Sequence, residues 1–209
     1  MLIQAYLKTR PYLYHLTDSS NISQMARTRC IAPATVLFER AARPDFLRRK
    51  RDKPERISIG RDVIVIRDQA PLHKGNLSLP AGYTFEEFVE SLNRRVFFWP
   101  GTAASPISYG IRHFDRYKNE GPAILRLTLA SLLAANAFAN PMFCGYNSGS
   151  PRCSYGVRSP RGPKTFLPAA EFEGTPGKVV EITFDSELAL PFDTEVGSCP
   201  TGPWRSLGK

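Results

Sequence analysis

The chain has 209 residues, of which 42% are hydrophobic and 22% are charged, and its 28 Lys and Arg against 19 Asp and Glu side chains give a net charge of +9. This composition is typical of a soluble globular protein and excludes a largely disordered chain. No stretch approaches the ~18 apolar residues of a membrane span, and the N-terminus does not resemble a signal peptide, so we expect one cytoplasmic domain over residues 1–209 without a membrane partner.

In chain order, short apolar segments alternate with helix signals, which predicts an α+β fold. Residues 12–16 are aromatic and apolar and predict a strand. Capping residues follow, and the apolar spacing from Ile22 predicts a short helix. Residues 32–60 show little periodicity and much charge, so we expect a long loop with a basic excursion over 40–60. Residues 63–66 are β-branched and predict a second strand.

The clearest helix signal lies near the middle of the chain. Thr84 and Glu87 have the spacing of a capping box, and apolar residues follow at helical intervals. Residues 96–99 predict a strand that ends at the following Pro-Gly pair. Ser105 precedes a proline, which is a favourable helix start, and the apolar spacing continues to about Lys118.

The second half of the chain has weaker signals. Residues 123–129 predict a strand and residues 129–138 predict a helix. Residues 140–164 are rich in Gly, Pro, Ser and Asn, which predicts a loop. Residues 179–184 predict the last strand, and we expect a loose polar tail from about Phe192.

Charge and cysteine content narrow the partners. Residues 40–56 contain eight basic and three acidic side chains. A basic face of this kind favours a polyanionic partner such as a nucleic acid, and the alternative is a solvated charged loop. The four cysteines form no Cys-x-x-Cys pair, so we expect free thiols and no metal site.

Three segments contain candidate functional residues. His15 and Thr17 alternate along the first strand and therefore share one face, where both can reach one ligand. The segment 94–101 is dense in aromatic side chains, and Phe98 or Trp99 is a candidate to line a pocket for a planar ring. For each segment the alternative is a structural role, in the strand for His15 and in the core for the aromatic residues.

The third segment is the loop 147–163, which contains several arginines and ends shortly before Glu171. Arginine forks and backbone N–H groups in a loop suit phosphate contacts. The arginines that we expect to contact a ligand here are Arg152, Arg158 and Arg161. The alternative is a surface loop whose arginines are solvated.

Taken in order, these segments resemble the ADP-ribosyltransferase superfamily, and within it the DarT-type nucleic-acid ADP-ribosyltransferases. The resemblance covers about residues 12–185. It rests on short motifs, which are Tyr14-His15-Leu16-Thr17-Asp18 with Asn21-Ile22, Leu47-Arg48-Arg49-Lys50-Arg51, Val96-Phe97-Phe98-Trp99-Pro100, Ser105-Pro106-Ile107-Ser108-Tyr109, Gly121-Pro122-Ala123-Ile124-Leu125 and Ala170-Glu171-Phe172.

The resemblance implies a single-domain fold with short mixed or antiparallel strands in a split sheet, and NAD as the co-substrate. It implies Glu171, Arg51 and His15 as catalytic residues. Glu181, inside a clearer strand pattern, is the alternative glutamate, and any arginine of 48–51 is a candidate for the diphosphate. The expected NAD-binding residues are His15, Thr17, Asn21, Arg51, Trp99 and Tyr109, and the expected acceptor-binding residues are Arg49, Arg152, Arg158 and Arg161.

The function that the resemblance implies is transfer of ADP-ribose from NAD to single-stranded DNA or RNA, in a toxin or phage-defence effector with an antitoxin or a reversing hydrolase as a further partner. A carboxylate would stabilise the oxocarbenium-like transition state as nicotinamide leaves. One alternative is an enzyme that acts on protein, a small molecule or water. Another is a nucleic-acid-binding or protein-binding module without catalysis.

Overall fold

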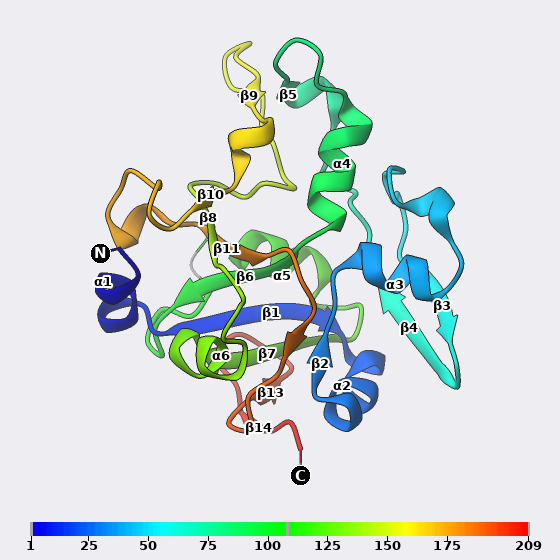
Figure 1. Ribbon diagram of the computed structural model, residues 1–209, viewed down its shortest axis with the longest axis vertical. Coiled ribbons are helices and arrows are strands. Elements are labelled where there is room, and N and C mark those ends of the chain that lie inside the picture. Colours follow the sequence, from blue (N-terminus) through cyan, green and yellow to red (C-terminus); the bar gives the residue numbers. More distant parts are fainter. Residues whose placement is uncertain (1, 108, 209) are drawn as a thin grey trace.

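The computed structural model describes residues 2–107 and 109–208; Ser108, part of the predicted helix start, lies outside this range (Figure 1). Its α-helices are α1 (Leu2–Thr9), α2 (Ile22–Thr28), α3 (Ala34–Arg40), α4 (Phe85–Asn93), α5 (Ile111–Tyr117) and α6 (Leu129–Ala135). Its strands are β1 (Tyr12–Asp18), β2 (Cys30–Ile31), β3 (Glu55–Ile59), β4 (Asp62–Ile66), β5 (Leu77–Ser78), β6 (Val96–Gly101), β7 (Pro122–Thr128), β8 (Met142–Cys144), β9 (Ser159–Pro160), β10 (Leu167–Pro168), β11 (Glu181–Phe184), β12 (Leu188–Ala189), β13 (Glu195–Gly197) and β14 (Arg205–Ser206).

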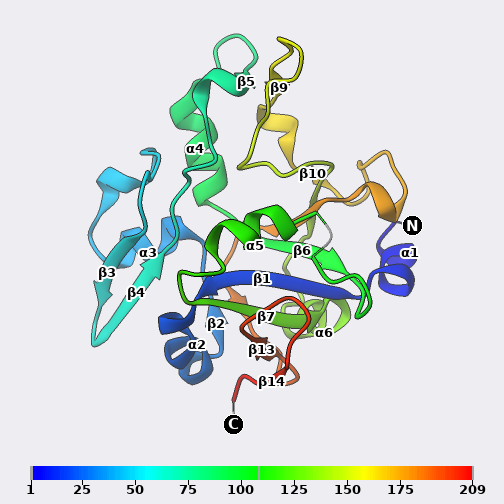
Figure 2. The same ribbon diagram turned by 180° about the vertical axis from the view of Figure 1, so that it is seen from behind.

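The α+β class is confirmed, and its main element is one antiparallel sheet with the strand order β10-β8-β11-β6-β1-β7-β13-β14. Side chains alternate between its two faces. Leu13 of β1 packs in a core with α1, α2 and α6, whereas the neighbouring Tyr14 packs with Phe114 of α5 on the opposite face. Figure 2 shows α5 on that opposite side of the sheet.

The sheet divides at β6. The first half of this strand, Val96–Phe98, pairs with β11, and the second half pairs with β1 through Trp99 to Gly101. Consequently β1 leaves β6 after Tyr14 and continues beside β7 alone. Backbone groups near the point of division, among them the carbonyl of Phe97, have no partner strand there and form hydrogen bonds with side chains instead.

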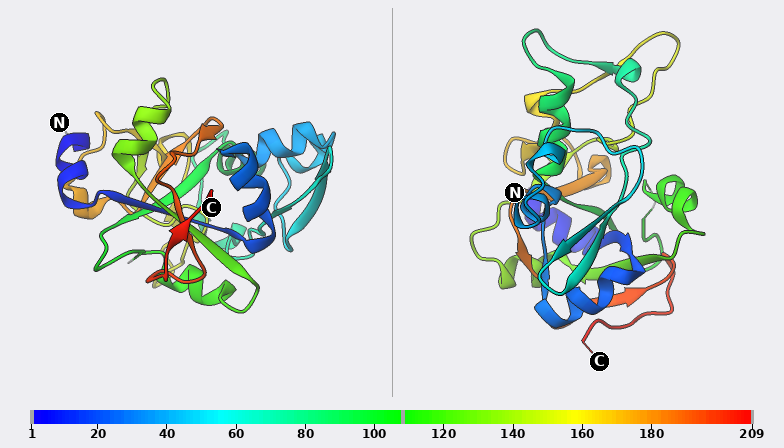
Figure 3. Two further views of the ribbon diagram at one scale, coloured as in Figure 1. Left: turned by 90° about the horizontal axis from the view of Figure 1, so that it is seen from below. Right: turned by 90° about the vertical axis from the view of Figure 1, so that its right-hand side faces the viewer.

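The predicted loop over 32–60 is instead a small lobe, formed by α3 and the β3–β4 hairpin beside the main sheet (Figures 1 and 3). Its own core contains Phe38 and Phe46, whose rings stack with centroids 4.9 Å apart, together with Ile57 and Ile64. Interleaved charged residues hide this strand pattern in the sequence.

Much of the charge in the basic run is neutralised within the fold. The ion pairs in this segment are Arg40–Glu187, Arg43–Asp45, Arg48 with Glu87 and Glu90, Arg49 with Asp45 and Glu55, and Lys50–Asp52. The expectation of an open cationic surface over 40–56 is therefore wrong for most of these side chains. Exposed pairs of this kind contribute little to stability but do cancel the local charge.

Several predicted elements are confirmed, and others need correction. The capping box is confirmed. Thr84 Oγ1 accepts a hydrogen bond from the Glu87 N–H at 3.1 Å, and the Glu87 carboxylate accepts one from the Thr84 N–H at 2.7 Å. The helix expected from Ser105 begins only at Ile111. The expected loose tail contributes β13 and β14 to the sheet, and the loop over 140–164 contains β8 and β9.

Two further findings concern the expected partners and thiols. Within residues 2–107 and 109–208, no helix has the length and apolar character needed to cross a membrane. All four cysteines are free thiols, as expected from their spacing, and only Cys153 is exposed.

Candidate functional site

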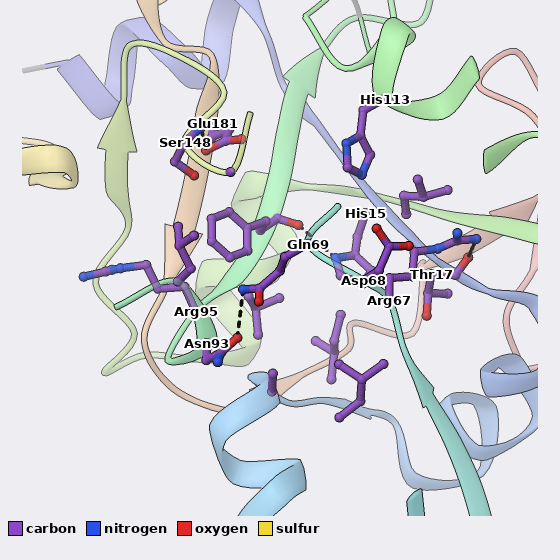
Figure 4. A pocket seen from close by; sticks show the side chains of 18 of the residues that line it. His15, Thr17, Arg67, Asp68, Gln69, Asn93, Arg95, His113, Ser148 and Glu181 are labelled. Carbon is purple, nitrogen blue, oxygen red and sulfur yellow. Dashed lines mark hydrogen bonds between the residues drawn. The ribbon is translucent and has the colours of Figure 1, made fainter. Parts of the chain in front are cut away.

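A cavity of about 530 Å³ lies where the sheet divides, between the sheet and the small lobe. Its walls come from β1, the segment after β4, the end of α4, β6, α5, the loop around Ser148 and the first residue of β11. Figure 4 looks into this cavity, with His15 between Glu181 and Arg67 in that view. This volume is within the range of cavities that hold a small-molecule ligand or cofactor.

Glu181 is the buried carboxylate of the cavity. It opens β11, is only 6% exposed, and accepts one hydrogen bond at Oε2 from the Ser148 N–H at 3.1 Å. Burial raises the pKa of Glu181 from its usual 4.5 to about 7, because the Ser148 hydrogen bond and the nearby Arg161 charge only partly offset desolvation of the carboxylate. A carboxyl group with this pKa can hold or release a proton near neutral pH.

His15 is held in one tautomer by the point of sheet division. Its Nδ1 lies 2.8 Å from the Phe97 carbonyl oxygen, and since a carbonyl only accepts, Nδ1 carries the proton. Burial lowers the pKa of His15 to about 4, so the ring is neutral at pH 7. Nε2 is therefore the nitrogen left to accept a hydrogen bond from a ligand in the cavity.

Thr17 and Asn21, both predicted to bind NAD, line the cavity but serve each other first. Asn21 Nδ2 donates to Thr17 Oγ1 at 3.0 Å and to the Val65 carbonyl at 2.8 Å, and Asn21 Oδ1 accepts from the Val65 N–H at 2.9 Å. This amide is thus used in joining β1 to β4. These bonds give Asn21 a structural role, and because it also lines the cavity, its contact with a ligand stays a prediction.

Within the run 48–51, Arg51 alone lines the cavity. Arg51 is 6% exposed, and its guanidinium donates to Asn93 Oδ1 at 2.7 Å and to the Arg67 carbonyl at 3.0 Å. Burial lowers its pKa to about 10, which leaves it protonated at pH 7. Arg49, expected to bind the acceptor, instead lies on the surface beside Asp45 and Glu55.

Sequence reasoning missed two arginines of the cavity, Arg67 and Arg95. Arg67 donates to the Thr17 carbonyl at 3.1 Å and lies over the Tyr117 ring, and Arg95 lies over the Phe166 ring. The Nε of each is buried without a hydrogen-bond partner among the described residues, as is the hydroxyl of Ser148. Both arginines line the cavity, so its wall carries positive charge that suits a polar or anionic ligand.

Aromatic rings form the wall opposite the lobe. Trp99 packs against His113 with centroids 5.3 Å apart, and its Nε1 donates to Asn147 Oδ1 at 3.2 Å. Tyr109 is partly exposed at the rim and donates its hydroxyl to the Gly177 carbonyl at 2.9 Å. Trp99 and Tyr109 thus lie at the cavity as expected. His113 was missed because the sequence predicts its helix but contains no motif that indicates which side chains of that helix contact a ligand.

The remaining predicted residues are dispersed. Glu171 is exposed in the turn after β10 and does not line the cavity, whereas Glu181, the alternative glutamate, does. Arg152 lines the cavity, whereas Arg158 is exposed outside it. Arg161 is buried and donates to the carbonyls of residues 147 and 148, which corrects its expected role from ligand binding to holding the loop.

Comparison with known proteins gives one match. The model of a family of unknown function, DUF7002, matches residues 11–191. This range contains every residue that lines the cavity, from His15 to Glu187. No curated protein matches the chain, and no solved structure matches it.

Proposed function

The chain belongs to the DUF7002 family, and we propose that it is a NAD-dependent ADP-ribosyltransferase whose catalytic carboxylate is Glu181. One observation carries this proposal: Glu181 and the free Nε2 of His15 share a cavity that Arg51, Arg67 and Arg95 also line. The motif resemblance to ADP-ribosyltransferases supports it independently. Glu181 takes the place for which Glu171 was the first candidate.

The donor set suits the parts of NAD. Arg67 and Arg95 line the cavity and form no ion pair with a described residue, and arginine forks bind a diphosphate well. The neutral His15 Nε2 can accept a ribose hydroxyl hydrogen. The rings of Trp99 and Tyr109 offer faces for the planar nicotinamide.

The proposed reaction breaks one bond and forms another at the same ribose carbon. The bond from this carbon to the nicotinamide nitrogen breaks, and the bonding electrons leave with nicotinamide. The Glu181 carboxylate stabilises the positive charge that develops on the ribose. A nucleophile of the acceptor then bonds to the carbon, and its proton passes to Glu181.

For the acceptor we propose a single-stranded nucleic acid. The net charge of +9 supports a polyanionic acceptor. Ion pairs neutralise much of the charge within residues 40–56, so we expect the acceptor to contact basic side chains outside that segment. An enzyme that modifies a base needs that base unstacked, which favours single strands.

The test uses NAD labelled in its adenylate part, incubated with the protein and with single-stranded DNA, RNA or protein. The expected result is label bound covalently to a nucleic acid, together with released nicotinamide. Label bound to protein, or free labelled ADP-ribose alone, would show that the acceptor is protein or water rather than a nucleic acid. Either result would still support cleavage of NAD. Intact NAD under all conditions would contradict the proposal.

A further inference from the structure

A second cavity lies next to the first, and of its lining residues the proposed NAD site uses Tyr109. Its volume is about 420 Å³, and Tyr109, Arg112, Asn147 and Arg152 line both cavities. Val180, the residue before Glu181, also lines it. The two cavities therefore share part of one wall, and the second also reaches the residue before β11.

The residue Arg152 also begins a short hairpin that ends at Ser159. The Arg152 N–H donates to Ser159 Oγ at 3.1 Å, and this hydroxyl donates back to the Arg152 carbonyl at 2.6 Å. At the tip, Ser154 and Val157 exchange two backbone hydrogen bonds of 3.0 and 2.9 Å. The hairpin 152–159 is thus closed at both its base and its tip.

The tip presents an aromatic side chain in an unfavourable conformation. Tyr155 has φ +50° and Gly156 has φ +79°, as in a two-residue turn whose central positions favour Asn and Gly. Tyr155 is fully exposed, at 104% of its reference area. Its ring therefore gains no burial that would explain a bulky residue at this position, and strain of this kind is typical of functional sites.

The charge around these features is positive. Arg112, Arg152 and Arg158 make no ion pair with any residue that the structure describes, in contrast to Arg48 and Arg49 of the basic run. Unpaired arginines at a cavity, together with an exposed aromatic ring on the hairpin that leaves it, are the components of a single-strand binding surface, in which arginines contact phosphates and bases stack on the ring. An acidic peptide would supply negative charge but not the planar bases that stack on such a ring.

We propose that the second cavity and the hairpin 152–159 form the acceptor site for a single-stranded nucleic acid. Arg112 and Arg152 contact its phosphates, and Tyr155 stacks on one of its bases. This inference rests on the proposed function, because the shared wall places a strand bound in the second cavity next to the cavity that contains Glu181.

The test measures binding of fluorescent single-stranded DNA and RNA oligonucleotides by anisotropy, without NAD, over about 50 to 200 mM salt. Tyr155→Ala is expected to weaken binding about tenfold, and Tyr155→Phe to keep wild-type affinity. Phe138→Ala is the matched control, since Phe138 is equally exposed (98%) and lies outside the proposed site. Arg152→Gln is expected to reduce the salt slope by about 0.7, and its control Arg49→Gln to leave the slope unchanged.

Equal affinity of Tyr155→Ala and Phe138→Ala would overturn the acceptor site, as would tighter binding of a protein or of duplex DNA than of single strands. Nicotinamide release by the wild-type protein, measured separately, tests the donor chemistry. Nicotinamide release by the wild-type protein, with no loss of oligonucleotide affinity in Tyr155→Ala, contradicts the acceptor site but not the donor chemistry. Weaker oligonucleotide binding by Tyr155→Ala, with no nicotinamide release by the wild-type protein, supports the binding site and contradicts the transferase.

Discussion

Ser148 donates its backbone N–H to Glu181 Oε2 at 3.1 Å, which connects a long loop to the first residue of β11. Arg161 holds the same loop from the other side, through the carbonyls of Asn147 and Ser148 at 3.1 and 3.3 Å. Its guanidinium also lies 3.8 Å from the centroid of the Tyr146 ring. The position of the buried carboxylate therefore depends on an arginine that contacts no ligand.

Replacing this arginine tests that dependence. Arg161→Lys keeps the charge but cannot form the same set of carbonyl hydrogen bonds, because a lysine lacks the planar fork. We expect the free energy of unfolding to fall by about 1–3 kcal/mol and nicotinamide release to fall at least about tenfold as the loop loosens. The control is Lys164→Ala, at an exposed site in the same segment. An Arg161→Lys protein that matches this control in urea unfolding and in turnover would contradict the role.

The Asn21 amide is expected to act on stability. Asn21→Ala leaves the N–H and C=O of Val65 without their partners in a buried setting. We expect a loss of about 3 kcal/mol in the free energy of unfolding, measured by urea titration. Ser23→Ala, at an exposed position of α2, is expected to change it by less than about 0.5 kcal/mol. Similar midpoints for the two variants would show that Asn21 has no structural role.

The raised pKa of Glu181 predicts a pH-dependent stability. Between pH 4.5 and about 7 the folded state binds the Glu181 proton more tightly than the unfolded chain does. Its contribution to stability therefore decreases as pH rises through this window, by on the order of 3 kcal/mol. Glu181→Gln removes this titration, so its stability relative to wild type should increase from pH 4.5 to 7. A constant difference would refute the shift, and Glu171→Gln provides the control.

The same titration predicts the pH profile of activity. The proposed mechanism uses ionised Glu181, so kcat/KM for nicotinamide release should rise with pH and level off above an apparent pKa near 7. The pKa of His15, about 4, lies below this range, so His15 adds no second limb near neutrality. Initial rates between pH 5 and 9 give the profile. A rate that falls over this range would contradict the assignment.

Local signals identified much of the fold. The Thr84 capping box, the aromatic strand over 12–16 and the β-branched strand near Glu181 depend on neighbouring residues, and the structure contains all three. Within the lobe over 34–66 the strand β4 was predicted, but α3 and β3 were missed, because the core of the lobe forms between residues such as Phe38 and Ile57 that are far apart in sequence and separated by charged side chains.

The site was identified in part. His15, Thr17, Arg51, Trp99 and Tyr109 do line the cavity. Glu171 matched a short motif but lies in an exposed turn, whereas Glu181 had only a strand pattern in its favour. What separates the two is the pairing of β11 between β6 and β8, which a single sequence does not reveal. Arg67 and Arg95 were not predicted. Their unsatisfied nitrogens result from tertiary packing, which a single sequence does not show.

The most direct test of the account compares Glu181→Gln with Glu171→Gln in nicotinamide release from NAD. The two variants make the same chemical change ten residues apart, one in the cavity and one on the surface. We predict a loss of at least about 100-fold for Glu181→Gln and near wild-type rates for Glu171→Gln. Full activity in Glu181→Gln, or loss only in Glu171→Gln, would contradict the assignment of Glu181 as the catalytic carboxylate.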